Sequence, residues 1–338
     1  MTLLDISTLE RFDSKGMYKI YDKWPEIARE SYKIVQEPFE FFDIDHIVFS
    51  GMGGSGAIGD VFSSILSKSN IHVCVAKGYL LPRTVDSKTL VITTSISGNT
   101  KETLTVLDSA KNSNCKIIAF SSGDKMQDFC SKNKIEFRNI PQLHSARASF
   151  TSFLYSMLNV LEPVTAIKKD DIMDSISCLE DLRKKISYKN LNENNPSLEL
   201  AKWIKGMPLI YYPWGLQATA IRFKNSLQEN AKLHAITENV IEACHNGIVA
   251  WERPSNIKPI LIEGRDDYVT TKERLAILKG YFDSKNIDYK EVISIRGSIL
   301  SKLINLIYLL DFSSIYYAIL SKIDPTPVDS INFVKSRL

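Results

Sequence analysis

Hydroxyl-bearing residues gather in one short stretch of the chain, residues 93–100, which reads Thr-Thr-Ser-Ile-Ser-Gly-Asn-Thr. An apolar run at 90–92 precedes it, and an amphipathic pattern with Leu104 and Leu107 on its apolar side follows it. We therefore expect a strand to end here and a helix to begin. Because the first helical turn has unpaired backbone N–H groups and a partial positive charge, such a turn can bind phosphate. The hydroxyls that could join it are those of Ser95, Ser97 and Thr100.

The same stretch also allows a plainer interpretation. Ser97 or Asn99 could simply cap the helix, since both residue types are common at the N-cap. Gly98 would suit either interpretation, because glycine permits close backbone approach or a positive φ angle. A second turn of the same kind, at residues 51–56, favours the phosphate interpretation.

The turn at 51–56 reads Gly-Met-Gly-Gly-Ser-Gly and follows a buried strand expected at 46–49. Its glycines have the spacing of a dinucleotide-binding turn, which normally requires an acidic residue at the end of the next strand. The next strand, at 71–75, is followed instead by Ala-Lys-Gly, although Lys77 could contact a ribose phosphate. The alternative is a sugar-phosphate turn in which Ser55 adds a hydroxyl donor.

Two residues in the second half of the chain could do chemistry on a bound sugar. Glu229 lies among amides at the expected end of a helix, and His245 lies in a polar turn further on. A carboxylate is ionised at neutral pH and can act as a base, while histidine can act as an acid or a base. The plainer interpretations are a solvated helix cap for Glu229 and a structural hydrogen-bonding role for His245.

The composition limits the partners that the chain can have. The net charge of +3 in 338 residues predicts no basic face for nucleic acid. The five cysteines and five histidines show no metal-ligand spacing, so we expect no metal and a reduced, cytoplasmic protein. We expect no membrane span, because no apolar run approaches the roughly 20 residues that cross a bilayer, and the start of the sequence shows no signal-peptide core.

Strands and helices are expected to alternate along the chain. The first half predicts strands at 46–49, 71–75, 90–95, 116–120 and 135–137, then a helix from Ser145 to Leu161 that has Arg147 in its first turn. The second half predicts strands at 209–212, 259–262 and 292–295, a long apolar helix at 298–321 and a final helix at 327–337. This alternation indicates an α/β protein with mainly parallel sheets, helices on both faces and ligands at the carboxyl ends of the strands.

A polar stretch at 190–196 marks the expected domain boundary. We expect an N-terminal helical segment at 1–40, a first domain at 41–164, a connecting helix and linker at 165–196, and a second domain at 197–338.

Several segments occur together in one order, and the order carries more information than any one segment. They are Met-Gly-Gly-Ser-Gly at 52–56, Ser-Ile-Ser-Gly-Asn-Thr at 95–100, Glu-Asn at 229–230, His-Asn at 245–246, and Asp-Pro-Thr-Pro-Val-Asp-Ser-Ile at 324–331 with Lys335 beyond it. Together they resemble the bifunctional phosphoglucose/phosphomannose isomerases of the sugar isomerase (SIS) superfamily. The serine turns are common to SIS proteins, whereas the later segments are more specific.

The resemblance implies two SIS domains, each a parallel sheet between helices (a three-layer αβα arrangement), in a homodimer. It implies an aldose–ketose isomerase that interconverts glucose 6-phosphate, and mannose 6-phosphate, with fructose 6-phosphate through a cis-enediolate. The residues that it implies for the substrate phosphate are Gly53, Gly54, Ser55, Ser95, Ser97 and Thr100.

For the reacting part of the sugar, the resemblance assigns Glu229 as the base that moves a proton between C1 and C2. Arg147 would stabilise the enediolate, His245 of the partner subunit would assist ring opening, and Lys335 would act at the ring oxygen. No cofactor is implied, because the redox change is internal to the sugar. The plainer interpretations are a surface salt bridge for Arg147 and a solvated side chain for Lys335.

Four positions depart from the family pattern without removing a reacting group: Ile96, Ala146, Gln228 and Gly247. Two other functions stay open. A non-catalytic phosphosugar-binding module would have similar serine turns, but no helix-turn-helix pattern precedes residue 40. An amino-sugar phosphate isomerase would use a similar enediol step, but this sequence shows no amidotransferase half.

Overall fold

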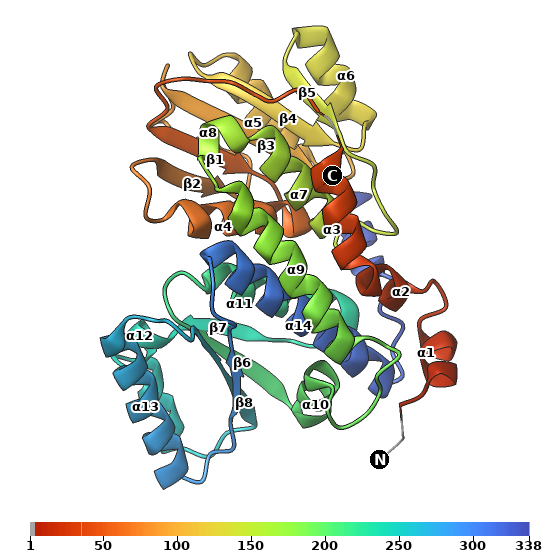
Figure 1. Cartoon of the computed structure of the whole chain (residues 1–338), viewed down its shortest axis with the longest axis vertical. Coiled ribbons are helices and arrows are strands. Elements are labelled where there is room, and N and C mark those ends of the chain that lie inside the picture. The colour runs from red at the N-terminus through yellow and green to blue at the C-terminus, as the bar shows by residue number, and fades with distance from the viewer. Residues whose placement is uncertain (1–3, 35, 338) are drawn as a thin grey trace. The chain divides into compact units, whose positions relative to one another are not determined.

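The computed structural model describes residues 4–34 and 36–337, and Figure 1 traces the chain. The described residues form two compact units. The first-sheet unit contains residues 23–34, 36–177 and 297–301, and the second-sheet unit contains residues 4–22, 178–296 and 302–337. Helices α9 (Lys169–Ile186) and α14 (Ile299–Leu320) each pass from one unit into the other. The four-part division expected from the sequence stays a prediction.

The first sheet has five parallel strands in the order β2-β1-β3-β4-β5. They are β1 (His46–Ser50), β2 (His72–Ala76), β3 (Thr89–Ser95), β4 (Lys116–Ser121) and β5 (Glu136–Asn139). The strands expected in the first half and their parallel pairing are confirmed. Because β2 and β3 lie on opposite sides of β1, the strand order reverses between β1 and β3, which is where open α/β sheets bind ligands.

Helices cover both faces of the first sheet (Figure 1). They are α3 (Trp24–Lys33), α4 (Gly53–Leu66), α5 (Lys101–Lys111), α6 (Asp124–Asn133), α7 (Phe150–Val160) and α8 (Glu162–Thr165). On one face, Phe49 of β1 stacks on Phe62 of α4 with ring centroids 5.0 Å apart. Its neighbour Val48 is buried in a cluster with Ala110 of α5 on the other face, as the alternation of side chains along a strand requires.

The second sheet has four parallel strands in the order β7-β6-β8-β9. They are β6 (Met207–Tyr212), β7 (Ile236–Asn239), β8 (Ile257–Glu263) and β9 (Lys290–Ile293). The sequence-based expectation missed β7, because this edge strand reads Ile-Thr-Glu-Asn and has one apolar residue. The expected fold class, two parallel sheets flanked by helices, is confirmed.

Helices also cover both faces of the second sheet. The helices of the second-sheet unit, besides the parts of α9 and α14 that lie in it, are α1 (Ile6–Phe12), α2 (Met17–Asp22), α10 (Pro196–Trp203), α11 (Gln217–Ala231), α12 (Val240–Ala243), α13 (Val269–Ser284), α15 (Asp329–Lys335) and the 3-10 helix η1 (Gly247–Glu252). On one face, Tyr211 of β6 and Phe282 of α13 enclose Trp251 of η1 in a buried cluster. The indole Nε1 of Trp251 donates to the Tyr211 hydroxyl at 2.9 Å, so the buried indole has its partner.

Helix α14 corrects one expectation about membranes. It is 22 residues long with a mean hydropathy of 1.6, so by length and composition it could cross a bilayer. However, 83% of the 18-residue apolar stretch to which this hydropathy value belongs is buried inside the protein, as in the core helix of a folded protein. Its apolar side chains therefore pack in the interior of the protein.

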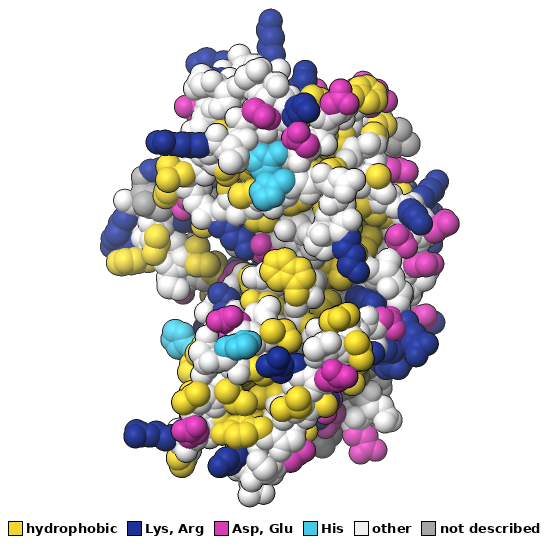
Figure 2. Space-filling model, turned by 90° about the vertical axis from the view of Figure 1, so that its left-hand side faces the viewer, with side chains coloured by type: hydrophobic (Ala, Val, Ile, Leu, Met, Phe, Trp, Pro, Cys, Tyr) yellow, Lys and Arg dark blue, Asp and Glu magenta, His cyan; other side chains and the backbone are white. Residues whose placement is uncertain are grey.

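The charged side chains on the face shown in Figure 2 do not separate by sign. Lysines and arginines are interspersed there with aspartates and glutamates, in keeping with the small net charge of +3. This face presents no basic stripe of the kind that binds a nucleic-acid backbone.

Gly98 provides a stability test of the turn after β3. Its φ angle is +71°, and an added Cβ would lie 2.1 Å from the carbonyl oxygen of Gly123. We expect Gly98→Ala to lower the free energy of unfolding by at least about 2 kcal/mol, because the backbone conformation and the space both exclude a side chain. Urea denaturation measures the change, and wild-type stability of this variant would contradict it. As a control, Gly280→Ala should stabilise α13 by roughly 0.5–1 kcal/mol, because nothing lies within 4 Å of the added Cβ.

His46 predicts a pH dependence of stability. Burial, and then the neighbouring His72, lower the pKa of this imidazole, whose Nδ1 contacts Thr89 Oγ1 at 3.3 Å. The unfolded chain therefore takes up a proton near pH 6.5 while the folded chain does not, so the free energy of unfolding should fall as the pH drops below about 6.5. Denaturation at pH 7.5 and 5.5 measures this change. The free energy of unfolding should fall less in His46→Gln than in wild type, and the variant His234→Gln, at an exposed histidine, serves as the control. Equal losses in wild type and His46→Gln would contradict this assignment.

Candidate functional site

The two serine turns lie at the carboxyl ends of adjacent strands in the first sheet. β1 leads into the turn at 51–56, and β3, paired with β1 along its length, leads into the turn at 95–100. The backbone N–H of Ile96 donates to Ser55 Oγ at 3.2 Å and so joins the two turns. The structure therefore brings Ser55 and Ser95 together at the point where the strand order reverses, although they are 40 residues apart in the sequence.

The helices that follow these turns begin without a side-chain cap. Met52 is the N-cap of α4 and Thr100 is the N-cap of α5, and neither side chain accepts a bond from its helix. The capping interpretation of Ser97 and Asn99 is therefore wrong: Ser97 Oγ accepts from Asn99 N at 3.4 Å, within the turn. Ser55 N donates to the Met52 carbonyl at 3.0 Å, and the N–H groups before it in α4, like those of the first turn of α5, lie outside the helical ladder and can bind an anion or water.

The hydroxyls around these helix starts are held in place by one another. Thr100 Oγ1 accepts from Ser95 Oγ at 3.0 Å, and Thr100 N donates to Ser95 Oγ at 3.4 Å. Ser55 and Ser95 are buried, whereas Ser97 and Thr100 are half-buried. Gly53 has a φ angle of +53° with nothing within 4 Å of a Cβ position, so its turn keeps room for a ligand.

Arg147 lies beside the first of these turns. A Cβ on Gly54 would lie 3.5 Å from Arg147 Cα and 3.4 Å from the Ala146 carbonyl oxygen, so the two backbones are in contact. Arg147 is only 5% exposed, so its side chain lies inside the protein rather than on the surface. The structure thus brings this guanidinium-bearing residue to the proposed phosphate turns.

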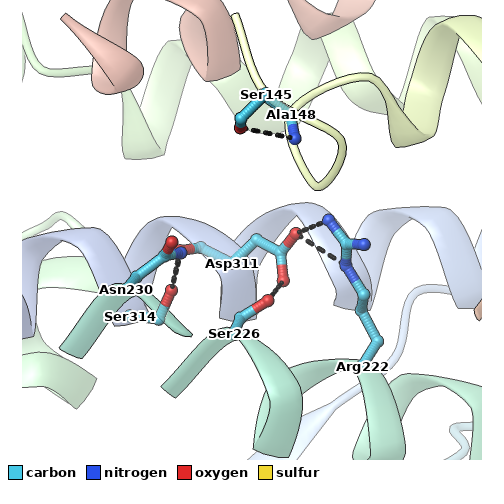
Figure 3. Close-up of polar contacts among 7 residues, drawn as sticks. All are labelled: Ser145, Ala148, Arg222, Ser226, Asn230, Asp311 and Ser314. Carbon is cyan, nitrogen blue, oxygen red and sulfur yellow. Dashed lines mark hydrogen bonds and ion pairs between the residues drawn. The ribbon is translucent and has the colours of Figure 1, made fainter. Parts of the chain in front are cut away.

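The helix expected from Ser145 begins later than the sequence indicates. It starts at Phe150, and Arg147 lies in a turn before it rather than in its first helical turn. The Ser149 hydroxyl donates to the carbonyl of Leu143 at 3.0 Å, and Ser145 Oγ accepts from Ala148 N at 3.4 Å (Figure 3). These side-chain bonds favour a turn over a helix, because serine competes for backbone partners.

Lys77, the residue that could contact a nucleotide, is paired with another side chain. Lys77 forms an ion pair with Asp60 at 2.5 Å, and its Cε lies 3.2 Å from a Cβ position on Gly56. Burial raises the pKa of Asp60, and the charge of Lys77 opposes that rise. Across residues 4–34 and 36–337, no three His, Cys, Asp or Glu side chains are grouped to hold a metal ion.

Glu229 is half-buried in the last turn of α11, in the second-sheet unit. One stripe of that helix faces α14 through polar contacts (Figure 3). Asp311 accepts from Arg222 Nε at 3.0 Å, from Arg222 Nη2 at 2.8 Å and from Ser226 Oγ at 2.6 Å. One turn further, Asn230 Nδ2 donates to Ser314 Oγ at 2.9 Å, so the residue next to Glu229 is tied to α14.

Arg222 and Asp311 form a buried ion pair, with side chains 3% and 0% exposed. Burial lowers the pKa of Arg222, but the charges of Asp311 and, to a smaller extent, Glu229 raise it, and the net shift is upward. The guanidinium therefore stays charged, and it attracts the carboxylate of Glu229 two turns along the same helix. The stripe fixes the rotation of α11 about its axis and hence the direction of Glu229.

Glu229 and His245 lie at opposite ends of the strands of the second sheet. α11 runs back from the carboxyl end of β6 to the start of β7, so Glu229 lies near the amino ends of the strands. His245 follows β7 and α12, so it lies near the carboxyl ends, and it is exposed. The four residues of β7 span about 13 Å, so the structure does not bring these two residues together within one chain.

Lys335 lies at the exposed end of α15. A second lysine, Lys232, lies near Glu229, and the sequence alone suggested no role for it. The Lys232 ammonium donates to the carbonyl oxygens of Glu229, Asp324 and Pro325 at 2.8, 3.1 and 3.3 Å. In the sequence, the only sign of this contact is that a lysine follows the expected base, Glu229, by three positions.

Family patterns match both halves of the chain. Residues 40–161 match the SIS domain, and residues 193–338 match the bacterial phospho-glucose isomerase C-terminal SIS domain. Solved structures show the same fold. A hypothetical protein from Thermus thermophilus superposes with a TM-score of 0.71 at 14% identity, covering 98% of this chain and 92% of that one. The C-terminal domain of glucosamine-fructose-6-phosphate aminotransferase from Francisella tularensis superposes with a TM-score of 0.70 at 15% identity, covering 92% and 98%.

Curated relatives are similar over nearly the whole sequence. A bifunctional phosphoglucose/phosphomannose isomerase from Caldicellulosiruptor bescii is 34% identical, over 95% of this chain and 98% of that protein. One from Aquifex aeolicus is 31% identical, over 91% and 98%. A D-glucosamine-6-phosphate 4-epimerase from Sulfolobus acidocaldarius is 28% identical, over 73% and 77%. The resemblance drawn from the sequence is confirmed: the chain belongs to the bifunctional phosphoglucose/phosphomannose isomerase family of the SIS superfamily.

Proposed function

We propose that the protein interconverts glucose 6-phosphate, and mannose 6-phosphate, with fructose 6-phosphate. The observation that carries the proposal is the pair of uncapped helix starts beside Ser55 and Ser95, in a chain 34% identical to such an isomerase. In this proposal the phosphate accepts hydrogen bonds from the first-turn N–H groups and the hydroxyls. The residues that hold it are Gly53, Gly54, Ser55, Ser95, Ser97 and Thr100.

The isomerisation itself needs one base and one fixed cation. Glu229 takes the proton from C2 of the open-chain aldose and returns it to C1, while the hydroxyl proton moves from O2 to O1. The developing enediolate oxygen needs a positive partner, which Arg147 supplies. A well-placed donor of this kind typically contributes about 3 kcal/mol. Since the sugar is oxidised at C2 and reduced at C1, the reaction consumes no redox cofactor.

Ring opening is the task of His245 and Lys335 in this proposal. Lys335 acts at the ring oxygen, and His245 acts from the partner subunit of a homodimer. The opposite positions of Glu229 and His245 on the second sheet support a second copy, because one chain does not bring them together. We place the enzyme in the cytoplasm.

Replacing the base gives the first activity test. Glu229→Gln should lower kcat for fructose 6-phosphate by about a thousandfold, because the amide cannot accept the C1 proton. KM should stay within about threefold of wild type, because the proposed phosphate contacts are made by other residues. Coupled assays measure both constants, and the exposed Glu273→Gln on α13 serves as the control with wild-type rates. Near wild-type turnover in Glu229→Gln would remove this residue from the mechanism.

Subunit complementation tests the place of His245. Glu229→Gln and His245→Ala should each be nearly inactive as pure dimers, and size-exclusion chromatography with light scattering should show a dimer of the 38.2 kDa chain. A heterodimer purified with two different tags should recover about half of the wild-type activity, because one of its two sites then contains neither substitution. A heterodimer as inactive as its parents would place His245 in the same site as the Glu229 of its own chain.

A further inference from the structure

Three lysines among the described residues have a positive φ angle at or just beyond the end of a helix. Lys134 and Lys232 are the C-caps of α6 and α11, with φ angles of 55° and 53°, and Lys322 lies two residues beyond the end of α14 with a φ angle of 60°. Glycine adopts this conformation freely at helix ends, whereas the Cβ atom of any other residue disfavours it. A lysine kept at such a position therefore raises the question of what its side chain contributes.

Lys232 differs from the other two in its contacts. Its ammonium group has three N–H donors, and each has a carbonyl acceptor: Glu229 at 2.8 Å, Asp324 at 3.1 Å and Pro325 at 3.3 Å. The ammonium groups of Lys134 and Lys322 make no hydrogen bond or ion pair with any described residue. The side chain of Lys232 thus offsets the cost of its backbone conformation, and those of the other two do not.

The acceptors join two segments that are far apart in the sequence. The Glu229 carbonyl belongs to the last turn of α11, where carbonyls lack helical partners and attract a cation. Asp324 and Pro325 begin the tail that leads to α15 and Lys335. Pro325 is buried, and Thr326 N donates to Asp324 Oδ1 at 2.8 Å, so the start of the tail is ordered at this point.

We propose that Lys232 is a positioning residue, which holds the helical turn carrying Glu229 against the start of the tail carrying Lys335. The roles of Glu229 and Lys335 rest on the proposed function. Lys232 keeps the last turn of α11 from fraying and fixes the origin of the tail, so both side chains return to the same place in each turnover. Loss of the tether lowers kcat rather than raising KM, because the proposed phosphate-binding residues all lie in the first-sheet unit.

The test compares the same substitution at two helix ends. Lys232→Gly and Lys134→Gly both relieve the positive φ angle, so neither should unfold the protein. Lys232→Gly should lower kcat by about 10- to 100-fold with KM within about twofold, whereas Lys134→Gly should keep both constants. Lys232→Arg, whose guanidinium can donate to the same carbonyls, should recover part of kcat. Hydrogen exchange over residues 321–332 should be faster in Lys232→Gly and unchanged in Lys134→Gly.

The two readouts separate this proposal from the proposed function. Wild-type kcat in Lys232→Gly, or lost kcat without faster exchange over 321–332, would overturn the positioning role. Equal loss of kcat in Lys134→Gly would also overturn it, since the effect would then come from helix ends in general. If the wild-type protein itself failed to isomerise fructose 6-phosphate, the proposed function would fail, and the exchange comparison alone would support or overturn the tether.

Discussion

The adjacency of β1 and β3 is the constraint on which the proposed phosphate site depends. Each strand leads at its carboxyl end into a helix, and no side chain caps either helix. With β2 on the other side of β1, no strand separates the two helix starts, and a hydrogen bond from the Ile96 N–H to Ser55 Oγ joins their turns. Two partial positive charges then act on the same small volume, beside the buried Arg147, and this arrangement suits a phosphate.

The second-sheet unit positions its candidate base by a different means. Arg222, Ser226 and Asn230 occur at intervals of four residues on α11 and face Asp311 and Ser314 on α14. A buried ion pair adds little net stability over an apolar contact, but breaking it by a slip of one helix costs about 3–5 kcal/mol. We therefore interpret this polar stripe as a device that fixes the register of two helices, and with it the orientation of Glu229.

The crossover geometry of the second sheet separates Glu229 from His245 within one chain. A helix that connects two parallel strands runs antiparallel to them, so its last turn returns to the amino ends of the strands. Glu229 lies in such a last turn, whereas His245 follows the next strand and lies beyond its carboxyl end. The proposed function, which uses both residues, therefore includes a second copy of the chain.

The sequence alone determined the features that depend on near neighbours. The strands and turns of the first half follow from short apolar runs that end in glycine and serine, and the family follows from the order of Glu229, His245 and the tail. The missed strand β7 and the late start of α7 were decided by pairing with β6 and by serine side-chain bonds, which leave little local signal.

Only the tertiary structure decided which of these residues meet. The burial of Arg147 against Gly54, the Arg222–Asp311 pair and the tether from Lys232 to the tail join positions that are 89–93 residues apart. A hydrogen bond or ion pair over such a separation has no periodicity in the sequence, because its partners are chosen by the packing of helices on a sheet and not by the residues beside them.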